Sequence, residues 1–355
     1  MVESLEWDDL PIARKSLIPG RGFFQASDRE PDVTESDLQE ADIVVIADAD
    51  ADGLTATALV KAAHGNATLV PTEPRSFESA LSFVAEAIEE PEAIYILDLS
   101  PEAFEPISAA LEQFIDAADS VSWYDHHEWD DEVESAVESI GIDLEIGDSD
   151  EVSTADVVLG AFDIEDETWT DLVAVVRDHD LWLREDPRSD DIADYAHWSR
   201  PAEFIETVSS HGAELPEAIM EDLEHRREEK QALIDIAVSR AEYRSISEYT
   251  VGITYGRCSQ NEVAEAMRSA GSDVAVIIKP SGGISFRGTE SFQRCHEVAA
   301  ELGGGGHPKA AGCKPDIFVD MLDYAHHWVT HGATARQAVL DTFDEVLEPT
   351  ETTER

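Results

Sequence analysis

From residue 42 onward, short runs of aliphatic residues alternate with longer amphipathic segments. The expected strands are 43–46, 67–70, 93–97 and 121–124, and the helices expected between them are 54–63, 77–88 and 103–117. Strands and helices that alternate in this order form a parallel sheet with helices on both faces. Ligands of such sheets bind beyond the carboxyl ends of the strands, so functional side chains are expected there.

The rest of the chain predicts further helices of the first domain, a connecting helix and a second, smaller α/β domain. Helices are expected at 153–162, 168–176 and 203–209, followed by a long charged helix at 216–243. The elements expected beyond it are strands at 251–255, 274–278 and 283–287, a helix at 262–269 and a helical part at 321–347. We therefore predict an α/β fold with a Rossmann-like parallel-sheet domain (1–205), a connecting helix (206–245), a smaller α/β domain (246–345) and an acidic tail (346–355).

The charge of the chain limits how it can meet its partners. Of 355 residues, 78 are acidic and 24 are basic, for a formal net charge of −54, while an apolar fraction of 43% argues against disorder. Acids spread along the whole chain, few lysines and a normal core are typical of a salt-in halophile; an acidic surface directed at one partner is the less favoured alternative. A polyanionic substrate must then be held by metal ions and a few arginines, because no general positive charge attracts it.

Cysteine usage and hydropathy indicate the compartment. Cys258, Cys295 and Cys313 contain no Cys-x-x-Cys pair, which argues against a disulfide framework or a structural zinc site and for reducing surroundings. No segment resembles a membrane span or a secretory signal. We therefore expect a cytoplasmic protein.

Four consecutive glycines, Gly303–Gly306, precede His307-Pro308-Lys309. Glycine has no side chain to pack and the most backbone entropy to lose, so such a run needs a compensating purpose. Bare N–H groups beside the positive charges of His307 and Lys309 would cradle a phosphate oxygen. We favour this interpretation over a flexible linker, because a helix-like segment precedes the run and a compact Ala-Ala-Gly follows it.

Acidic and histidine clusters follow three of the expected strands and one expected helix. They are Asp48-Ala49-Asp50-Ala51-Asp52-Gly53, Asp98, Asp125-His126-His127 and Asp178-His179-Asp180. Each alone could be a solvated turn in so acidic a chain, but the four together are hard to attribute to composition. Carboxylates with imidazole and without cysteine suit Mn²⁺ or Mg²⁺, and a pair of such ions would support metal-assisted hydrolysis of a phosphoester.

These motifs in this order, closed by Gly-Gly-Gly-Gly-His-Pro-Lys-Ala-Ala-Gly, resemble the DHH/DHHA1 phosphoesterase superfamily over residues 40–320. Its members include RecJ-type single-strand exonucleases, nanoRNase-type oligoribonucleases and cyclic-dinucleotide phosphodiesterases. The resemblance implies that the first domain is a DHH phosphoesterase domain and the last a DHHA1 substrate-binding domain. It also implies an active site between the two.

By position, the resemblance implies two manganese ions, with magnesium as the alternative. The residues that match the ligands are Asp48, Asp50, Asp98, His126 and Asp178. Asp98 would bridge the two ions, Asp48 would bind the second, and Asp52 is either a further ligand or a group that orients one. A histidine of some relatives is replaced by Val44 here, as in RecJ-like members, which leaves the second ion fewer protein ligands.

The resemblance assigns catalytic and substrate-binding residues in the same way. Asp98, Asp125 and His127 match catalytic positions, and His127 would contact the scissile phosphate, with a packing role as its alternative. The residues that match substrate-binding positions are Ser285, Arg287, Gly304, Gly305, Gly306 and His307. The planar guanidinium of Arg287 suits phosphate oxygens, and a surface ion pair is its alternative.

Four further side chains are assigned from general considerations. We expect Asn261 to cap the helix that follows it, and contact with the substrate is its alternative. We expect Trp182, Trp198 and Trp328 to pack, although an aromatic side chain near the site could stack on a base.

The sequence therefore predicts a metal-dependent phosphodiesterase that degrades short single-stranded nucleic acids, RNA or DNA, from one end. A cyclic-dinucleotide or nucleotide bisphosphate phosphoesterase is the alternative within the class. An inactive DHH scaffold in replication is the alternative outside it, and the intact ligand set disfavours this scaffold. The sequence leaves open the polarity of cleavage, a homodimer, and a partner in replication or repair.

Overall fold

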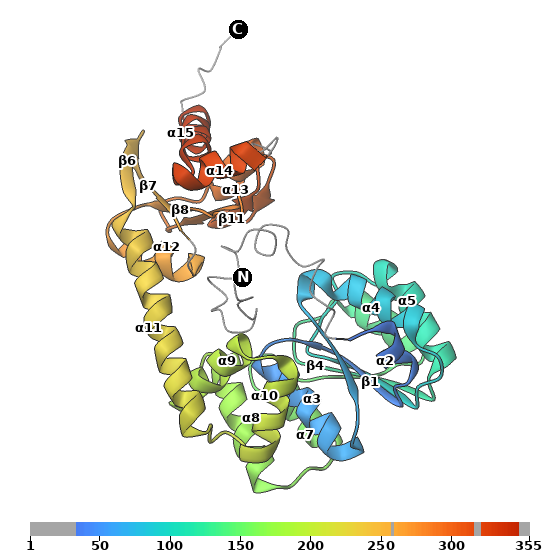
Figure 1. The fold of residues 1–355 in the computed structure, drawn as a ribbon. Helices are drawn as coiled ribbons and strands as arrows, with labels where there is room; N and C mark the ends of the chain where they lie inside the picture. Colours follow the sequence, from blue (N-terminus) through green and yellow to red (C-terminus); the bar gives the residue numbers. More distant parts are fainter. Residues whose placement is uncertain (1–32, 257–258, 316–320, 348–355) are drawn as a thin grey trace, which may run out of the picture. The chain divides into compact units, whose positions relative to one another are not determined.

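The computed structural model describes residues 33–256, 259–315 and 321–347. The expected tail beyond residue 347, Cys258 and the start of the chain lie outside this range. Contacts divide the chain into two compact units, an N-terminal unit of residues 29–223 and a C-terminal unit that contains residues 224–355 (Figure 1). The boundary falls within helix α11 (Glu217–Ser239), which occupies most of the stretch expected to form a connecting helix.

A five-stranded parallel sheet forms the centre of the N-terminal unit, as predicted. Its strands, in the spatial order β2-β1-β3-β4-β5, are β1 (Ile43–Asp48), β2 (Thr68–Thr72), β3 (Ala93–Leu97), β4 (Ser120–Asp125) and β5 (Asp143–Ile146). The sequence did not predict β5, because this short edge strand alternates acidic and aliphatic residues and none of them is fully buried.

Side chains of the sheet alternate between two cores, since successive residues of a strand point to opposite faces. On one face, Val44 and Ile46 of β1 pack with α4 (Phe77–Ala87) and α5 (Glu105–Ala117). On the other face, Val45 and Ala47 pack with three helices. These are α3 (Ala51–His64), α7 (Thr154–Ala161) and α8 (Glu167–Asp180). Helices thus cover both faces, as the sequence predicted (Figure 1).

Further helices complete the N-terminal unit. Leu172 and Val176 of α8 pack against α9 (Ser189–Trp198) and α10 (Pro201–His211), and the same cluster includes Leu54 of α3. The short elements outside this cluster are α2 (Glu35–Gln39), η2 (Pro74–Ser76) and α6 (Asp131–Ser139). The packing of α9 and α10 fixes the position of α8, whose C-terminal end carries the predicted cluster Asp178-His179-Asp180.

The C-terminal unit is built on a six-stranded mixed sheet of spatial order β10-β11-β9-β8-β7-β6. Its strands are β6 (Glu242–Ile246), β7 (Tyr249–Tyr255), β8 (Val274–Ile278), β9 (Ile284–Gly288), β10 (Gly305–Gly306) and β11 (Ala310–Cys313). Helix α12 (Gln260–Ser269) covers part of one face, and α13 (Cys295–Glu301) and α15 (Ala333–Leu347) cover the other. Among these described strands, β7 and β8 alone pair in parallel.

Three predictions for the C-terminal unit differ from the structure. The long helix ends at Ser239, and β6 follows in place of its expected last turn. The expected helical part at 321–347 is two helices, α14 (Met321–Val329) and α15, because Gly332 adopts a left-handed φ of 75° between them. The third difference is the hairpin of β10 and β11, two strands that the sequence did not predict and that include part of the glycine run.

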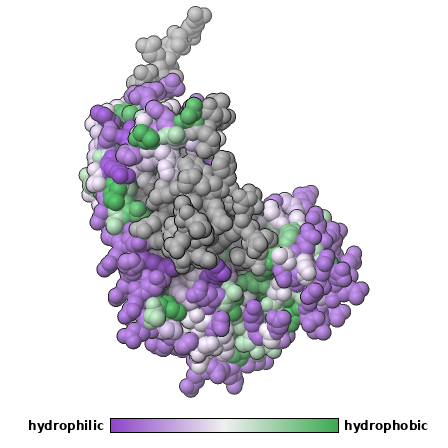
Figure 2. All heavy atoms as spheres, in the orientation of Figure 1, coloured by the Kyte–Doolittle hydropathy of each residue, from purple (hydrophilic) through white to green (hydrophobic). Residues whose placement is uncertain are grey.

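Figure 2 shows that hydrophilic residues cover most of the coloured surface on the face drawn, in keeping with the acidic composition. Within the residues that the structure describes, no helix is long and apolar enough to cross a membrane.

Candidate metal centre

The predicted acidic side chains lie at the topological switch point of the parallel sheet. The chain leaves β1 for α3 on one face, and it leaves β3 for α5 on the opposite face, although β1 and β3 are neighbours. A crevice forms beyond the carboxyl ends of two such strands, and in sheets of this order it is the usual ligand site. Asp48 is the last residue of β1, and Asp98 directly follows β3.

The turn between β1 and α3 explains the spacing of the first motif. Asp50 caps α3, because its Oδ1 accepts the amides of Asp52 and Gly53 at 3.0 and 3.1 Å. A Cβ atom on Gly53 would lie 2.4 Å from the carbonyl oxygen of Asp48, so only glycine lets the helix begin this close to the strand. The turn therefore holds Asp48 and Asp50 beside each other.

Seven side chains form one continuous set that we call the acidic cluster. Its members are Asp48, Asp50, Asp52, Asp98, His126, His127 and Asp180. Within it, three groups have potential ligand atoms within 4.8 Å of one another: Asp48 with Asp50 and Asp98; Asp98 with His126 and His127; and Asp52 with His126 and Asp180. Asp98 and His126 each belong to two groups, so they connect the cluster.

Asp98 is buried, and it adopts a left-handed backbone conformation with φ of 59°. Aspartate tolerates this conformation better than most residues, and such strain is often found at functional sites. Its amide donates to Tyr124 O at 3.0 Å, and Oδ1 accepts the hydroxyl of Thr154 at 3.0 Å. These contacts fix the carboxylate between β1 and β4, where it can reach both ends of the cluster.

His126 is buried among three carboxylates. Its Nε2 lies 3.2 Å from Asp180 Oδ2, 3.7 Å from Asp98 Oδ1 and 4.0 Å from Asp52 Oδ2. Neither ring nitrogen forms a hydrogen bond with any described residue. A buried imidazole in such surroundings needs a partner, and a divalent cation shared with the carboxylates would provide one.

His127 is oriented by Asp125, which lies outside the cluster as defined above. Asp125 is fully buried; its Oδ1 lies 2.7 Å from His127 Nδ1, and its Oδ2 accepts the indole N–H of Trp129 at 2.6 Å. Both oxygens are therefore engaged, and the hydrogen bond that His127 donates to Asp125 raises the pKa of His127. The half-exposed ring of His127 thus presents Nε2 as a donor to whatever lies beside the cluster.

Asp52 connects the cluster to α7. Its two oxygens accept the amides of Thr154 and Ala155, at 2.7 and 2.9 Å, at the start of that helix. These hydrogen bonds favour the orienting role among the two alternatives that the sequence left open, because each oxygen already has a strong donor.

The structure places Asp180, in contrast to the expected Asp178, in the cluster. Residues two apart on a helix point in nearly opposite directions, so only one of the two can face β4. Asp178 Oδ1 accepts the amide of Glu185 at 2.8 Å, and its carbonyl oxygen accepts the amide of Leu183 at 2.9 Å. Its carboxylate therefore supports the turn after α8. The sequence alone could not show which of the two aspartates faces the cluster, because both lie at the end of the same helix.

The electrostatics of the acidic cluster favour a bound cation. Burial, with the charge of Asp50, raises the pKa of Asp48 to about 7, and burial, with the charges of Asp180 and Asp50, raises that of Asp52 to about 7. Burial and the charge of Asp52 raise the pKa of Asp98 as well, and burial with the charge of Asp50 raises that of Asp180 to about 6. A divalent ion would relieve this repulsion, and the oxygen and imidazole donors fit Mn²⁺ or Mg²⁺.

A cavity of about 430 Å³ opens beside the cluster. Its lining includes His126, His127 and Asp180, together with Trp182. Trp182 was expected to pack, but 67% of its surface is exposed, because the turn after α8 carries it away from the core.

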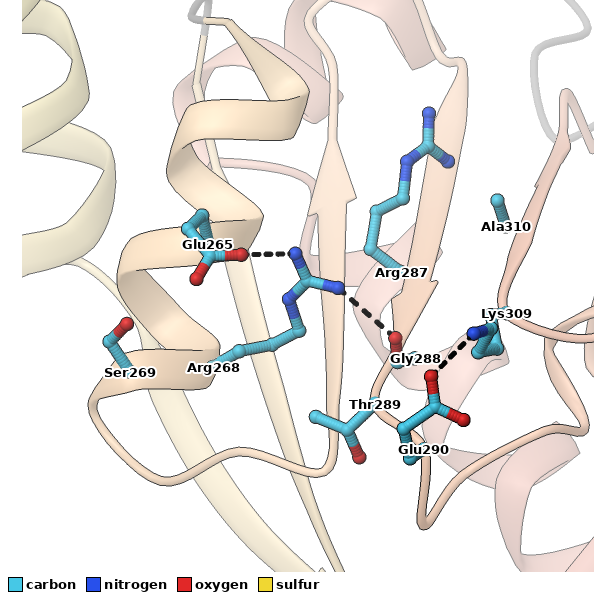
Figure 3. Close-up of a pocket in the computed structure, with 9 residues that line it drawn as sticks. All are labelled: Glu265, Arg268, Ser269, Arg287, Gly288, Thr289, Glu290, Lys309 and Ala310. Carbon is cyan, nitrogen blue, oxygen red and sulfur yellow. Dashed lines mark hydrogen bonds and ion pairs between the residues drawn. The ribbon is translucent and has the colours of Figure 1, made fainter.

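In the C-terminal unit, Arg287 lines a second cavity, of about 520 Å³ (Figure 3). Arg268 and Lys309 line it too; Lys309 Nζ lies 2.6 Å from Glu290 Oε1, and Arg268 pairs with Glu265. Figure 3 shows the guanidinium of Arg287 turned away from that of Arg268. Three basic side chains around one cavity are unusual in a chain with 24 basic residues, and they could bind a phosphate.

Two neighbours of Arg287 form hydrogen bonds that the sequence did not predict. Asn261 Oδ1 accepts a hydrogen bond from Arg287 Nε at 3.0 Å, and Ser259 occupies the cap position that we had assigned to Asn261. The hydroxyl of Ser285 donates to Gln260 Oε1 and is buried. The sequence did not identify Arg268 as a residue of this cavity, because a single arginine in a helix cannot be distinguished from an ordinary surface residue.

The glycine run forms a tight hairpin in place of an open cradle. A Cβ atom on Gly304 would lie 2.2 Å from Gly312 O, and one on Gly306, which has φ of 137°, would lie 2.6 Å from Ala311 Cα. The amide of Gly304 donates to Ala299 O at 2.8 Å, and that of His307 donates to Ala310 O at 2.7 Å. These two N–H groups are thus engaged within the protein, and close approach to β11 accounts for the glycines at 304 and 306.

Comparison with known proteins bears on the fold. No family model and no curated protein sequence matches this chain. In structure it is similar to exonuclease RecJ bound to manganese, with a TM-score of 0.51 and 16% identity over 86% of this chain and 96% of that one. It is also similar to the pGpG-specific phosphodiesterase PggH from Vibrio cholerae, with a TM-score of 0.47 and 13% identity over 84% of this chain and 99% of that one.

A third similar structure is RecJ from Thermus thermophilus in complex with Mn²⁺, with a TM-score of 0.47 and 15% identity over 89% of this chain and 59% of that one. At such identities the likeness concerns the fold, and the assignment rests on the first RecJ structure, whose TM-score exceeds 0.5. Fold and motif order thus agree: the chain has the RecJ-like α/β fold that its resemblance to the DHH/DHHA1 phosphoesterase superfamily implied.

Proposed function

We propose that this protein is a metal-dependent phosphodiesterase that hydrolyses short single-stranded nucleic acids. The observation that carries the proposal is the acidic cluster at the switch point of the parallel sheet, with the buried His126 among its carboxylates. Paired metal ions in such a site would polarise a phosphodiester and activate a water molecule. Mn²⁺ is the ion we propose, with Mg²⁺ as its alternative.

The proposed ligands follow the geometry of the cluster. Asp48, Asp50 and Asp98 would hold one ion, and Asp98, His126 and Asp180 the other. Asp180 takes the place that the sequence assigned to Asp178. Asp52, whose oxygens accept two amides of α7, would keep these ligands in position.

His127 is the proposed contact to the scissile phosphate. Asp125 holds the protonated Nδ1, which leaves an Nε2–H group free to donate to a phosphate oxygen. Charge that develops on this oxygen during hydrolysis would strengthen the bond, so the interaction favours the transition state. Asp125 acts through His127 as a positioning residue.

Binding of the remaining substrate is assigned to the C-terminal unit. Arg287, with Arg268 and Lys309 around the same cavity, would bind a phosphate of the chain, and the exposed His307 would add a further donor. Exposed ion pairs such as that of Lys309 with Glu290 contribute little stability, so a phosphate can displace the acid.

Short substrates are favoured because a net charge of −54 repels a long polyanion. Binding must rely on a few local contacts, which extend over only a few nucleotides. Cyclic dinucleotides and nucleotide bisphosphates remain the alternative substrates, since they need the same contacts.

A substrate panel would test the proposal. Purified protein with Mn²⁺ in molar KCl is incubated with short RNA, short DNA, long single-stranded DNA, cyclic dinucleotides and nucleotide bisphosphates, and the products are resolved by length. We expect the short strands to be cut most rapidly. Asp98→Asn and His126→Ala should each lower the rate by at least about 100-fold.

The matched control is Asp116→Asn, on the exposed face of α5, which should keep the wild-type rate. Equal inactivity of the wild type and the two cluster variants on every substrate would reject hydrolysis and support the inactive scaffold instead.

A further inference from the structure

The turn after α8 places an exposed indole beside the acidic cluster. Trp182 is 67% exposed, and the adjacent Leu183 is 50% exposed, whereas Trp123 of the same unit is fully buried. Indole is among the most costly side chains to leave in water, so its exposure at this position calls for a ligand.

Trp182 lines the same cavity as His126, His127 and Asp180. The cavity, of about 430 Å³, is within the range of sites that enclose a small molecule. A phosphate bound at the acidic cluster would therefore have the indole within reach of the group attached to it.

The backbone that holds the indole in this exposed position is conformationally strained. Trp182 and Arg184 both adopt left-handed conformations, with φ of 56° and 57°. The turn is fixed by hydrogen bonds from Trp182 N to His179 O at 3.0 Å and from Leu183 N to Asp178 O at 2.9 Å. The carboxylate of Asp178 adds the bond from Glu185 N. Two strained residues within one anchored turn indicate that the position of this indole is maintained.

Arg184 adds positive charge to the same feature. Its Cζ lies 4.5 Å from the centroid of the Trp182 ring, and no carboxylate of the described residues lies within ion-pair distance of it. The imidazole of His179 also stacks on this indole, with ring centroids 6.0 Å apart and planes 28° apart. A planar ligand would therefore contact the part of the indole that Arg184 and His179 leave exposed. An arginine without an acidic partner among the described residues is uncommon in so acidic a chain, and it is available for a phosphate.

We propose that Trp182 is a stacking site for the nucleobase next to the scissile phosphate, with Arg184 behind the indole. This inference rests on the proposed function and specifies its substrate: the site selects phosphodiesters that carry a base over inorganic or base-free phosphates. A base is the ligand that fits, because it is flat, is attached to the phosphate by a ribose, and stacks on an indole whatever its sequence.

The first experiment compares wild type, Trp182→Ala and Trp182→Phe on a short oligonucleotide and on two versions of it. These versions lack the base on one or the other side of the cleaved bond. For Trp182→Ala on the intact strand we expect a loss of kcat/KM of about 10- to 100-fold, mainly through KM. Trp182→Phe keeps a ring and should stay within about threefold of the wild type. On the strand that lacks the stacked base, the wild type and Trp182→Ala should be equal.

Leu183→Ala is the matched control, because it shortens a neighbouring exposed side chain without removing the indole. It should keep the wild-type rates. Equal losses for Trp182→Ala on intact and base-free strands, or no loss on the intact strand, would overturn the stacking site; the first result would show a general effect on the turn.

A binding measurement separates this inference from the proposed function. In the Asp98→Asn background, the tryptophan emission of the protein is followed during titration with a mononucleotide and with ribose 5-phosphate. We expect quenching by the mononucleotide only, and its loss in Trp182→Phe. Quenching without hydrolysis by the wild type would reject the proposed function alone. Hydrolysis without quenching, or quenching unchanged in Trp182→Phe, would reject the stacking site alone.

Discussion

At the scale of single residues, the acidic cluster depends on which of two neighbouring aspartates faces it. Asp180 approaches His126 to 3.2 Å, whereas Asp178 accepts the amide of Glu185 and supports the turn that carries Trp182. The two side chains lie on the same helix and have the same chemistry, yet their surroundings give them different roles: one would bind an ion, and the other would stabilise the backbone.

Replacing each aspartate by alanine should separate these roles. Asp180→Ala is expected to weaken Mn²⁺ binding by about tenfold or more and to stabilise the metal-free protein near neutral pH, because it removes a partly buried carboxylate that its neighbours repel. Asp178→Ala should lower the free energy of unfolding by about 1–3 kcal/mol, because a backbone donor loses its acceptor, and leave the affinity for Mn²⁺ nearly unchanged. Calorimetric titration and denaturant unfolding in molar KCl measure both quantities. The opposite assignment of the two effects would restore Asp178 as the ligand.

At the scale of elements, the start of α3 decides how closely the ligands gather. A side chain at residue 53 would collide with the carbonyl of Asp48, so the helix would have to move away from β1. Asp50, which caps the helix, would move with it. The motif therefore needs its glycine for packing as much as its aspartates for chemistry.

A pair of glycine substitutions tests this argument. Gly53→Ala should destabilise the protein by about 1–3 kcal/mol because of overlap with the backbone of β1, and it should also weaken metal binding. Gly160→Ala, in α7, meets no atom within 4 Å and should stabilise the protein by about 0.5–1 kcal/mol through helix propensity. Both are measured by denaturant unfolding. Equal changes in the free energy of unfolding for the two substitutions would show that a side chain at residue 53 does not collide with β1.

Helix α14 carries a buried histidine that should make the C-terminal unit sensitive to acid. Burial lowers the pKa of His327 below its ordinary value of 6.5, although its Nε2 lies 3.0 Å from Lys279 O. The folded state therefore binds this proton less readily than the unfolded state. Its contribution to stability is complete above about pH 6.5 and decreases as the pH falls toward the lowered pKa.

We expect the free energy of unfolding to fall more steeply between about pH 7.5 and 5.5 in the wild type than in His327→Gln. Unfolding is measured at constant KCl. The exposed neighbour His326 is the control: His326→Gln should keep the wild-type pH dependence. If the free energy of unfolding depends on pH in the same way in the wild type and in His327→Gln, His327 does not contribute to the acid sensitivity.

Much of the site could be predicted from the strand pattern, for a physical reason. Buried parallel strands are continuous aliphatic runs, so the residues at their ends, Asp48, Asp98 and Asp125, were identified without knowledge of the fold. The side on which a helical residue lies depends on tertiary packing, so Asp178 and Asp180 could not be separated. The strands β5, β10 and β11 were missed because acidic residues and glycines have low strand propensity, and pairing with neighbours overrides it.

At the scale of the whole molecule, net charge is the dominant constraint. With 78 acidic residues among 355, the folded state concentrates negative charge that the unfolded chain spreads out. The proposed adaptation to a salt-rich cytoplasm follows from this imbalance, since the Debye length falls to about 3 Å at 1 M salt.

Stability should therefore depend strongly on salt. We expect the Tm of the protein to rise continuously from about 0.1 to 2 M KCl, because screening removes repulsion between carboxylates. Thermal unfolding by circular dichroism measures the Tm, and equal osmolality of sucrose provides a control for effects of excluded solutes. A Tm that is independent of KCl would contradict an adaptation to high salt.

The carboxylates proposed to bind ions all come from residues 48 to 180, whereas Arg268, Arg287 and Lys309 come from beyond Glu224. Under the proposed function, the reaction chemistry and the basic contacts to more distant phosphates are thus encoded in separate stretches of the gene. Mutations that reshape the later stretch could redirect the protein to another polynucleotide or dinucleotide without disturbing the ions. Such a division lets the hydrolytic machinery be inherited intact while substrate preference evolves.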